Sequence, residues 1–222
     1  NVLSSAYFTG LQLSRMAEDI MLGQTHGFAL IDVDQAFCTG SSMMPQKKNA
    51  DFVELLRGAC GVFTANFMGF ATTLKSLPTS YNRDLQWDKK YLFDSVETME
   101  SVLRMLAKVF KTIEYRRSRA SEMVKDESLF ATDYADYLVN KGVPFKDAHD
   151  QVGSIVHFAE GVKKPLSKIG LDLLRQMAPK TEGDVYALFD AKHSVRMKRT
   201  QGSTHPSEVT KQITFWKKKL RG

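Results

Sequence analysis

The chain has 222 residues, of which 43% are hydrophobic and 25% charged, and these proportions are typical of a soluble globular protein of one or two domains. No unbroken apolar stretch reaches the length of a transmembrane helix, and the first residues lack the basic start of a secretory signal. Two cysteines are too few for a disulfide framework or a zinc site. We therefore expect a cytoplasmic protein without a metal, a cofactor or a membrane partner.

The net charge of +6 is unevenly distributed, because residues 192–222 contain nine Lys or Arg and one acid, Glu208. A basic tail can bind nucleic acid. Base-stacking aromatics are not interleaved with these charges, however, and the adjacent Phe215 and Trp216 fit packing better. We interpret the tail as a solvated helix face and expect no nucleic-acid partner.

Three long helices are predicted in the first half of the chain. Apolar residues recur at steps of three and four along residues 2–22, 51–76 and about 85–113. The segment 51–76 is apolar on more than one face, as expected for a helix inside a bundle. Long helices with short connections favour antiparallel packing.

The pattern changes after Arg117, where the predicted helices become shorter and are broken by Gly and Pro. The clearest of them cover 132–139, 145–162 and 207–220. Few runs alternate with period two, so the fold class is all-α. We expect a central helical-bundle domain at residues 1–120 and a small helical C-terminal domain at residues 121–222.

The most informative segment precedes the second predicted helix and reads Gly-Ser-Ser-Met-Met-Pro-Gln-Lys-Lys-Asn at positions 40–49. Gly and Pro keep it out of regular structure. Hydroxyls, ammonium groups and backbone N–H groups near a helix N-terminus all favour negative charge, so the segment fits an anion site. The alternative is a solvated, Lys-rich turn.

This segment resembles the signature loop of the fumarase/aspartase superfamily, in the form found in argininosuccinate lyases. Three further segments, at residues 13–19, 81–89 and 131–145, are similar to the same lyases. The resemblance implies an all-α homotetramer that catalyses β-elimination of argininosuccinate to arginine and fumarate, in arginine biosynthesis, without a cofactor. Because family chains are much longer, it also implies that the N-terminal half of the family chain is a partner of this one.

The resemblance also assigns roles to individual residues. Ser41 would be a catalytic acid or base and Lys47 its stabilising cation, while Glu54 would pair with a histidine from another subunit. The expected substrate-binding residues are Ser42, Asn49, Tyr81, Gln86 and Lys89. Each has a structural alternative: the serines fit turns or caps, Glu54 suits a helix dipole, and the 81–89 cluster fits a polar helix start on which Gln86 and Lys89 share one face.

Two other functions compete with this interpretation. Another lyase of the superfamily, such as adenylosuccinate lyase, is disfavoured by Gln46-Lys47-Lys48 and by the 81–89 cluster. An inactive structural protein of the δ-crystallin type shares the same fold. Because the catalytic histidine of the family belongs to its N-terminal half, we expect the 222-residue chain alone to be inactive.

Overall fold

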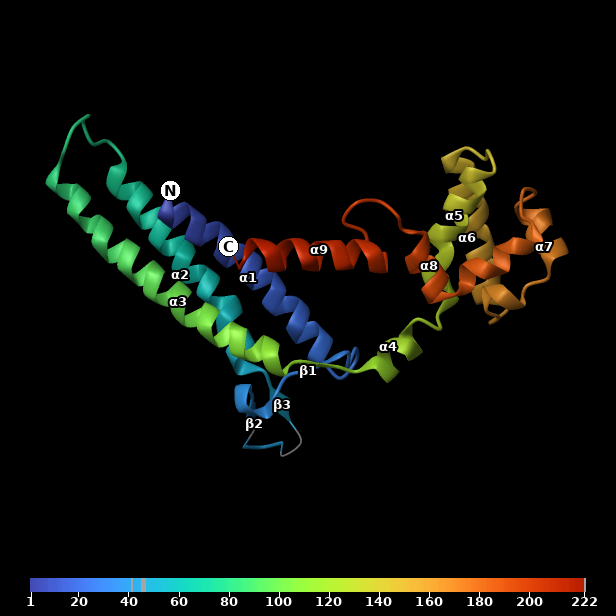
Figure 1. Ribbon diagram of the computed structural model, residues 1–222, viewed down its shortest axis with the longest axis horizontal. Helices are drawn as coiled ribbons and strands as arrows, with labels where there is room; N and C mark the ends of the chain where they lie inside the picture. The colour runs from blue at the N-terminus through green and yellow to red at the C-terminus, as the bar shows by residue number, and fades with distance from the viewer. Residues whose placement is uncertain (41, 45–46, 222) are drawn as a thin grey trace. The chain divides into compact units, whose positions relative to one another are not determined.

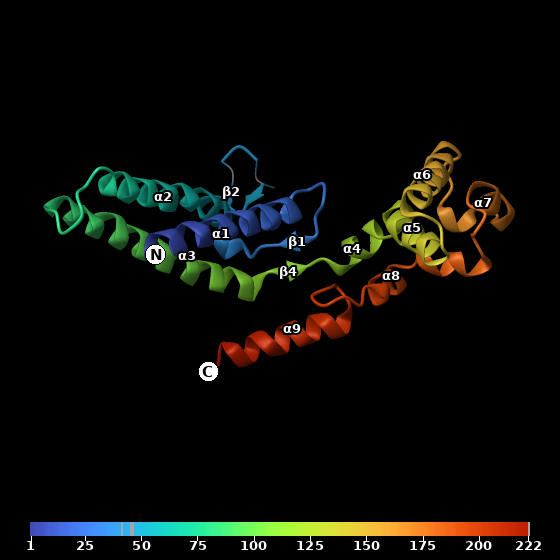
Figure 2. The ribbon, with the colours of Figure 1, turned by 90° about the horizontal axis from the view of Figure 1, so that it is seen from above.

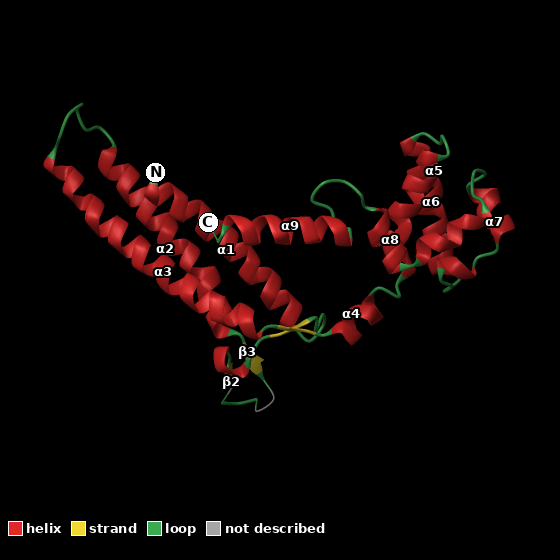
Figure 3. Ribbon diagram, viewed as in Figure 1, coloured by secondary structure: helices red, strands yellow, loops and turns green. Residues whose placement is uncertain are grey.

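The computed structural model describes every residue except 41, 45, 46 and 222, and the chain forms two compact units, residues 1–120 and residues 121–222. The all-α fold class predicted from sequence is confirmed, since helices dominate both units (Figures 1 and 3). No described helix combines the length and the apolar character that crossing a membrane requires.

Three long helices build the first unit: α1 (Val2–Gln24), α2 (Asp51–Leu74) and α3 (Asp88–Thr112). The helix α2 runs antiparallel to both of its neighbours, and two views show the three helices side by side (Figures 1 and 2). The main apolar cluster of this unit lies toward the end of the bundle where α2 begins, and it includes Val33 and Ala50 from the connection between α1 and α2. This core comprises Leu13, Ala17, Ile20, Val33, Ala50, Val53, Leu56, Leu106 and Val109.

The chain between α1 and α2 carries the short elements of this unit. Two antiparallel pairs of two-residue strands occur: β1 (Ile31–Asp32) with β4 (Glu114–Tyr115), and β2 (Thr39–Gly40) with β3 (Lys48–Asn49). The 3₁₀ turn η1 (Gln35–Phe37) lies between the strands β1 and β2. The first pair attaches the segment after α3 to the segment after α1, and the second closes the signature loop.

The third helix begins later than the sequence pattern predicts. Residues Arg83–Trp87 form a 3₁₀ turn, η2, and the α-helix starts at Asp88 instead of about Leu85. The reason is local, since the Leu85 amide bonds to the Asn82 carbonyl three residues back at 3.1 Å. Such turns are frequent at the N-termini of α-helices.

Shorter helices form the second unit, which α4 (Arg117–Met123) joins to the first. The apolar core of this unit is centred on Tyr134, Leu138, Ile155, Leu174 and Val185. Its elements are η3 (Glu127–Phe130), α5 (Ala131–Asn140), α6 (Phe145–Gly161), η4 (Leu166–Lys168), α7 (Leu171–Met177), η5 (Gly183–Phe189), α8 (Ala191–Met197) and α9 (Pro206–Lys219).

A buried hydrogen bond joins two distant segments of this core, because the hydroxyls of Tyr134 and Thr181 lie 2.7 Å apart. Replacing Tyr134 with phenylalanine leaves the Thr181 hydroxyl buried without this partner. We expect the free energy of unfolding to fall by about 1–3 kcal/mol, the usual cost of an unsatisfied buried polar group. Urea unfolding followed by circular dichroism measures the difference.

The control is the double variant Tyr134→Phe/Thr181→Val, which removes both polar groups and should recover part of the lost stability. The pH dependence provides a second check, because burial raises the pKa of Tyr134 from 10.0 to about 12. This group therefore stabilises the fold fully below pH 10, and its contribution disappears as the pH rises toward 12. Equal unfolding free energies for wild type and Tyr134→Phe would contradict the assignment.

Candidate functional site

The signature loop is closed at its base by the pairing of β2 with β3, in which Thr39 lies opposite Asn49 and Gly40 opposite Lys48. Inside the loop, the Lys47 amide bonds to the Met44 carbonyl at 2.9 Å. Ser42, a predicted substrate-binding residue, is exposed. Ser41, the predicted catalytic residue, lies outside the described residues.

The two adjacent lysines of the loop have different surroundings. The Lys48 ammonium forms an ion pair with the Asp32 carboxylate at 2.9 Å and is only partly exposed. The Lys47 side chain is exposed and makes no ion pair with any described residue. The loop therefore presents one cation that is already neutralised and one that is available to an anionic ligand.

Asn49 and Glu54 follow the loop into α2. The Asn49 side chain is half-buried, and its side-chain amide has no hydrogen-bond partner within the described part of the chain. Glu54 is exposed in the first turn of α2, where Asp51 adds a second acid near the positive end of the helix dipole. Lys47 and Asn49 thus lie two residues apart at the end of the loop, and Glu54 follows in the first turn of α2.

The second predicted cluster lies in the connection between α2 and α3. The Gln86 side-chain amide donates to the Tyr81 hydroxyl at 2.9 Å, and Tyr81 is 66% exposed. Lys89 is exposed, 3.6 Å from Asp88. Gln86 belongs to η2 and Lys89 to the first turn of α3, which begins directly after η2. Residues three apart lie on one face in both types of helix, so the shared face of Gln86 and Lys89 stays a prediction.

The sequence analysis did not identify Asn82 as a residue that supports this cluster. Ser80 has a φ of 104°, a conformation that costs about 1–3 kcal/mol for a non-glycine residue. The Asn82 amide offsets the strain by donating to the carbonyls of Pro78 at 3.1 Å and Ser80 at 3.2 Å. The Asn after Tyr81 in the motif was a visible signal, but nothing in the sequence gave it a supporting role.

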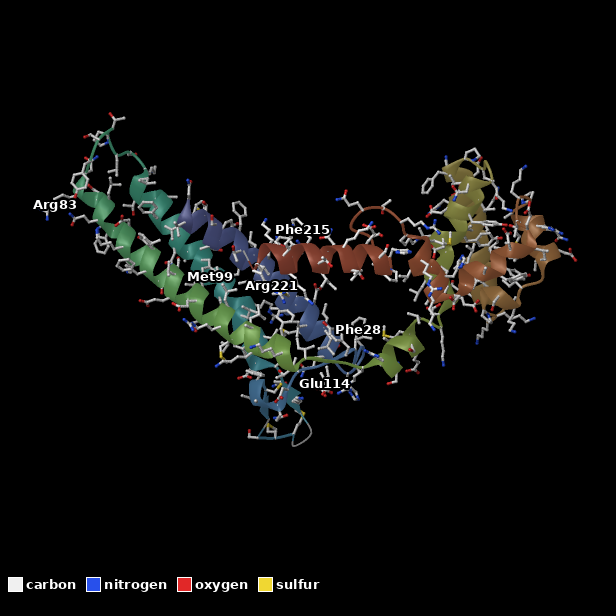
Figure 4. The ribbon with its side chains drawn as sticks, in the orientation of Figure 1. Phe28, Arg83, Met99, Glu114, Phe215 and Arg221 are labelled. Carbon is white, nitrogen blue, oxygen red and sulfur yellow. The ribbon has the colours of Figure 1, made fainter. Side chains whose placement is uncertain are left out.

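The two clusters lie at opposite ends of the bundle. The helix α2 lies between them along the chain, and its 24 residues correspond to an axial length of about 36 Å. Figure 4 labels Arg83 in the 81–89 cluster at one end and Glu114, the strand partner of Asp32, at the other end. One chain therefore does not bring Lys47 and Asn49 together with Tyr81, Gln86 and Lys89.

No group of acidic, histidine or cysteine side chains suited to a metal ion occurs among the described residues. The chemistry that these residues offer is that of ammonium, amide and hydroxyl groups acting on an anion. Carboxylates of a small organic acid are the simplest ligands for such a set.

Comparisons with solved structures define the class of fold. The structure of EDDS lyase in complex with formate matches with a TM-score of 0.79 at 25% identity, covering 99% of this chain and 45% of that one. A class II fumarase from Schistosoma mansoni matches with a TM-score of 0.72 at 16% identity, covering 89% of this chain and 39% of that one. The chain thus has the helical fold of the fumarase-type lyases.

Comparisons with sequences are more specific. The family model described as "Argininosuccinate lyase C-terminal" matches residues 128–196, and the model described as "Lyase" matches residues 1–64. Argininosuccinate lyases of Caldicellulosiruptor saccharolyticus and Caldicellulosiruptor bescii are 41% and 42% identical over 95% and 96% of this chain. The chain belongs to the argininosuccinate lyase family, and it spans about half the length, 46%, of these two curated relatives.

Proposed function

We propose that this chain is part of an argininosuccinate lyase and that the complete enzyme splits argininosuccinate into arginine and fumarate. The observation that carries the proposal is the signature loop itself, which offers an exposed ammonium at Lys47 and, at Asn49, a side-chain amide without a hydrogen-bond partner among the described residues. The relatives support the same activity, since they are argininosuccinate lyases at 41% and 42% identity. Arginine biosynthesis in the cytoplasm is the corresponding setting.

The reaction needs a base, an acid and a clamp for developing charge. A C–H bond beside a carboxylate breaks, the neighbouring C–N bond breaks, a C=C bond forms, and the leaving guanidinium nitrogen receives a proton. Negative charge grows on the carboxylate as the proton leaves. An ammonium such as that of Lys47 stabilises this charge more strongly than it stabilises the ground state.

The predicted roles divide between the two clusters. At the loop, Ser41 acts as the acid or base, Ser42 and Asn49 donate hydrogen bonds to a carboxylate, and Glu54 raises the basicity of a histidine from another subunit. At the opposite end, Tyr81, Gln86 and Lys89 bind the remaining polar groups of the substrate. The Gln86–Tyr81 hydrogen bond keeps the first two of these side chains together before substrate arrives.

A complete site then needs more than one copy of the chain, because the length of α2 separates the two clusters by about 36 Å. Packing bundles antiparallel brings the loop end of one copy to the 81–89 end of another, as closed homo-oligomers with two-fold axes allow. A homotetramer, with the N-terminal half of the protein supplying the catalytic histidine, satisfies both requirements. Large apolar side chains on the outside of the bundle support such packing, including Leu55, Val62, Phe93, Val96 and Leu103.

The test is fumarate release from argininosuccinate, followed by ultraviolet absorbance. The 222-residue chain is measured alone and together with the N-terminal half of the protein. We expect turnover only when both halves are present. Turnover by the purified chain alone would overturn the split site, whereas a folded tetramer of both halves without turnover would favour a structural, δ-crystallin-like role. Turnover of adenylosuccinate instead would assign the other lyase.

A further inference from the structure

A carboxylate outside the signature loop holds the loop through one of its two lysines. Asp32 accepts from the Lys48 ammonium at Oδ1, at 2.9 Å, and from the Arg116 guanidinium at Oδ2, at 3.2 Å. Both oxygens of this carboxylate are therefore occupied by cations from different parts of the chain. The pKa of Asp32 is held below its ordinary value, chiefly by the hydrogen bond from Lys48.

Asp32 is itself held in place by the backbone around it. It lies in β1, where its register partner in β4 is Glu114. The Arg116 amide bonds to the Leu30 carbonyl at 2.9 Å, and Arg119 donates to the carbonyls of Gly27 and Phe28 at 3.0 and 3.1 Å. The segment after α3 thus fixes the position of Asp32 relative to the bundle.

This fixed carboxylate determines which lysine of the loop is available. Lys48 lies in β3 directly opposite Gly40, so an anchor on Lys48 acts on the closed base of the loop. Successive residues of an extended chain point to opposite sides. Within β3, Asn49 therefore lies on the side of the strand opposite to the Asp32–Lys48 pair, while Lys47 precedes the strand and makes no ion pair with any described residue.

We propose that Asp32 is a positioning residue, which holds Lys48 so that the loop presents Lys47 and Asn49 to the substrate. The role rests on the proposed lyase function, because it concerns the same site. Without the Asp32 carboxylate, Lys48 and Arg116 lose the anion between them and repel each other. Lys48 then becomes a second free cation next to Lys47, and the loop loses its anchor.

The decisive variant is Asp32→Asn in the full-length enzyme, which keeps the shape of the side chain and removes its charge. We expect kcat to fall about 10- to 100-fold, the usual effect of a small misplacement of catalytic groups, while KM changes little. Lys48→Met should cause the same loss, Lys48→Arg should retain most of the activity, and the double variant Asp32→Asn/Lys48→Met should be no worse than either single variant.

A matched control breaks another ion pair of the same unit. Glu18 on α1 and Arg57 on α2 form an exposed pair at 2.6 Å that touches no loop residue. Glu18→Gln removes one carboxylate from the bundle, as Asp32→Asn does, and should leave kcat unchanged. Thermal unfolding of each variant shows whether the fold persists. If Asp32→Asn does not fold, Lys48→Met tests the same ion pair from the other side.

Amide hydrogen exchange of residues 47–49 gives a readout that does not depend on activity. We expect faster exchange there in Asp32→Asn and Lys48→Met than in wild type, and no change in Glu18→Gln. Wild-type kcat and wild-type exchange in a folded Asp32→Asn enzyme would overturn the proposal, as would additive losses in the double variant. A wild-type protein without lyase turnover would refute the proposed function, and exchange alone would then decide whether Asp32 anchors the loop.

Discussion

Replacing Lys47 with methionine is expected to lower the rate of fumarate release about 100- to 1,000-fold, the usual effect of removing one group that stabilises developing negative charge. Lys47 is exposed on the signature loop and makes no ion pair with any described residue. Its ammonium is therefore free for the substrate carboxylate. Methionine is similar in length and has no charge, so the loss reports the charge itself. Steady-state kinetics with argininosuccinate measure it.

The control is Lys108→Met, which removes an exposed lysine from α3 in the same bundle. It makes the same chemical change away from both clusters and should leave turnover within about twofold of wild type, because exposed substitutions away from special features have small effects. A Lys47→Met enzyme that is folded and as fast as Lys108→Met would remove Lys47 from the mechanism.

Mixing two inactive variants is expected to restore activity when their defects lie at opposite ends of the bundle. Lys47→Met is expected to inactivate the loop end, and Gln86→Ala the 81–89 end. If one copy supplies the loop and another supplies Gln86, a site in a mixed oligomer is intact when the first copy has the wild-type Lys47 and the second has the wild-type Gln86. Random assembly of equal amounts gives about one quarter of the sites intact. Activity after co-expression, compared with each variant alone, measures the recovery.

The matched control mixes two single variants, Lys47→Met and Asn49→Ala, whose defects lie on the same loop. Every loop in that mixture carries one defect, so activity should not recover beyond the level of the better single variant. Recovery by the same-loop pair, or equal failure of both mixtures with intact oligomers, would show that the site does not combine opposite ends of different copies. Size-exclusion chromatography confirms that mixed oligomers form.

Local sequence patterns were sufficient for the fold class and for the long helices. Steps of three and four between apolar residues predicted α1 and α2 to within two residues at each end, because this spacing reports the period of a helix directly. The start of α3 was predicted too early, since a 3₁₀ turn and an α-helix start present similar patterns. Ser41 lies outside the described residues, so its catalytic role stays a prediction.

The sequence by itself determined that this protein is helical and carries a loop with the residue types of a carboxylate site, because helix period and motif spacing are local properties. Only the tertiary structure distinguished the surroundings of Lys47 from those of Lys48. The Arg116–Asp32 contact that supports Lys48 spans 84 residues and leaves no periodic pattern in the sequence. The tertiary structure also placed the loop and the Tyr81–Lys89 cluster at opposite ends of α2. That separation follows from the rigid length of a helix between two motifs, and it is the physical reason why we expect the site to be shared between copies.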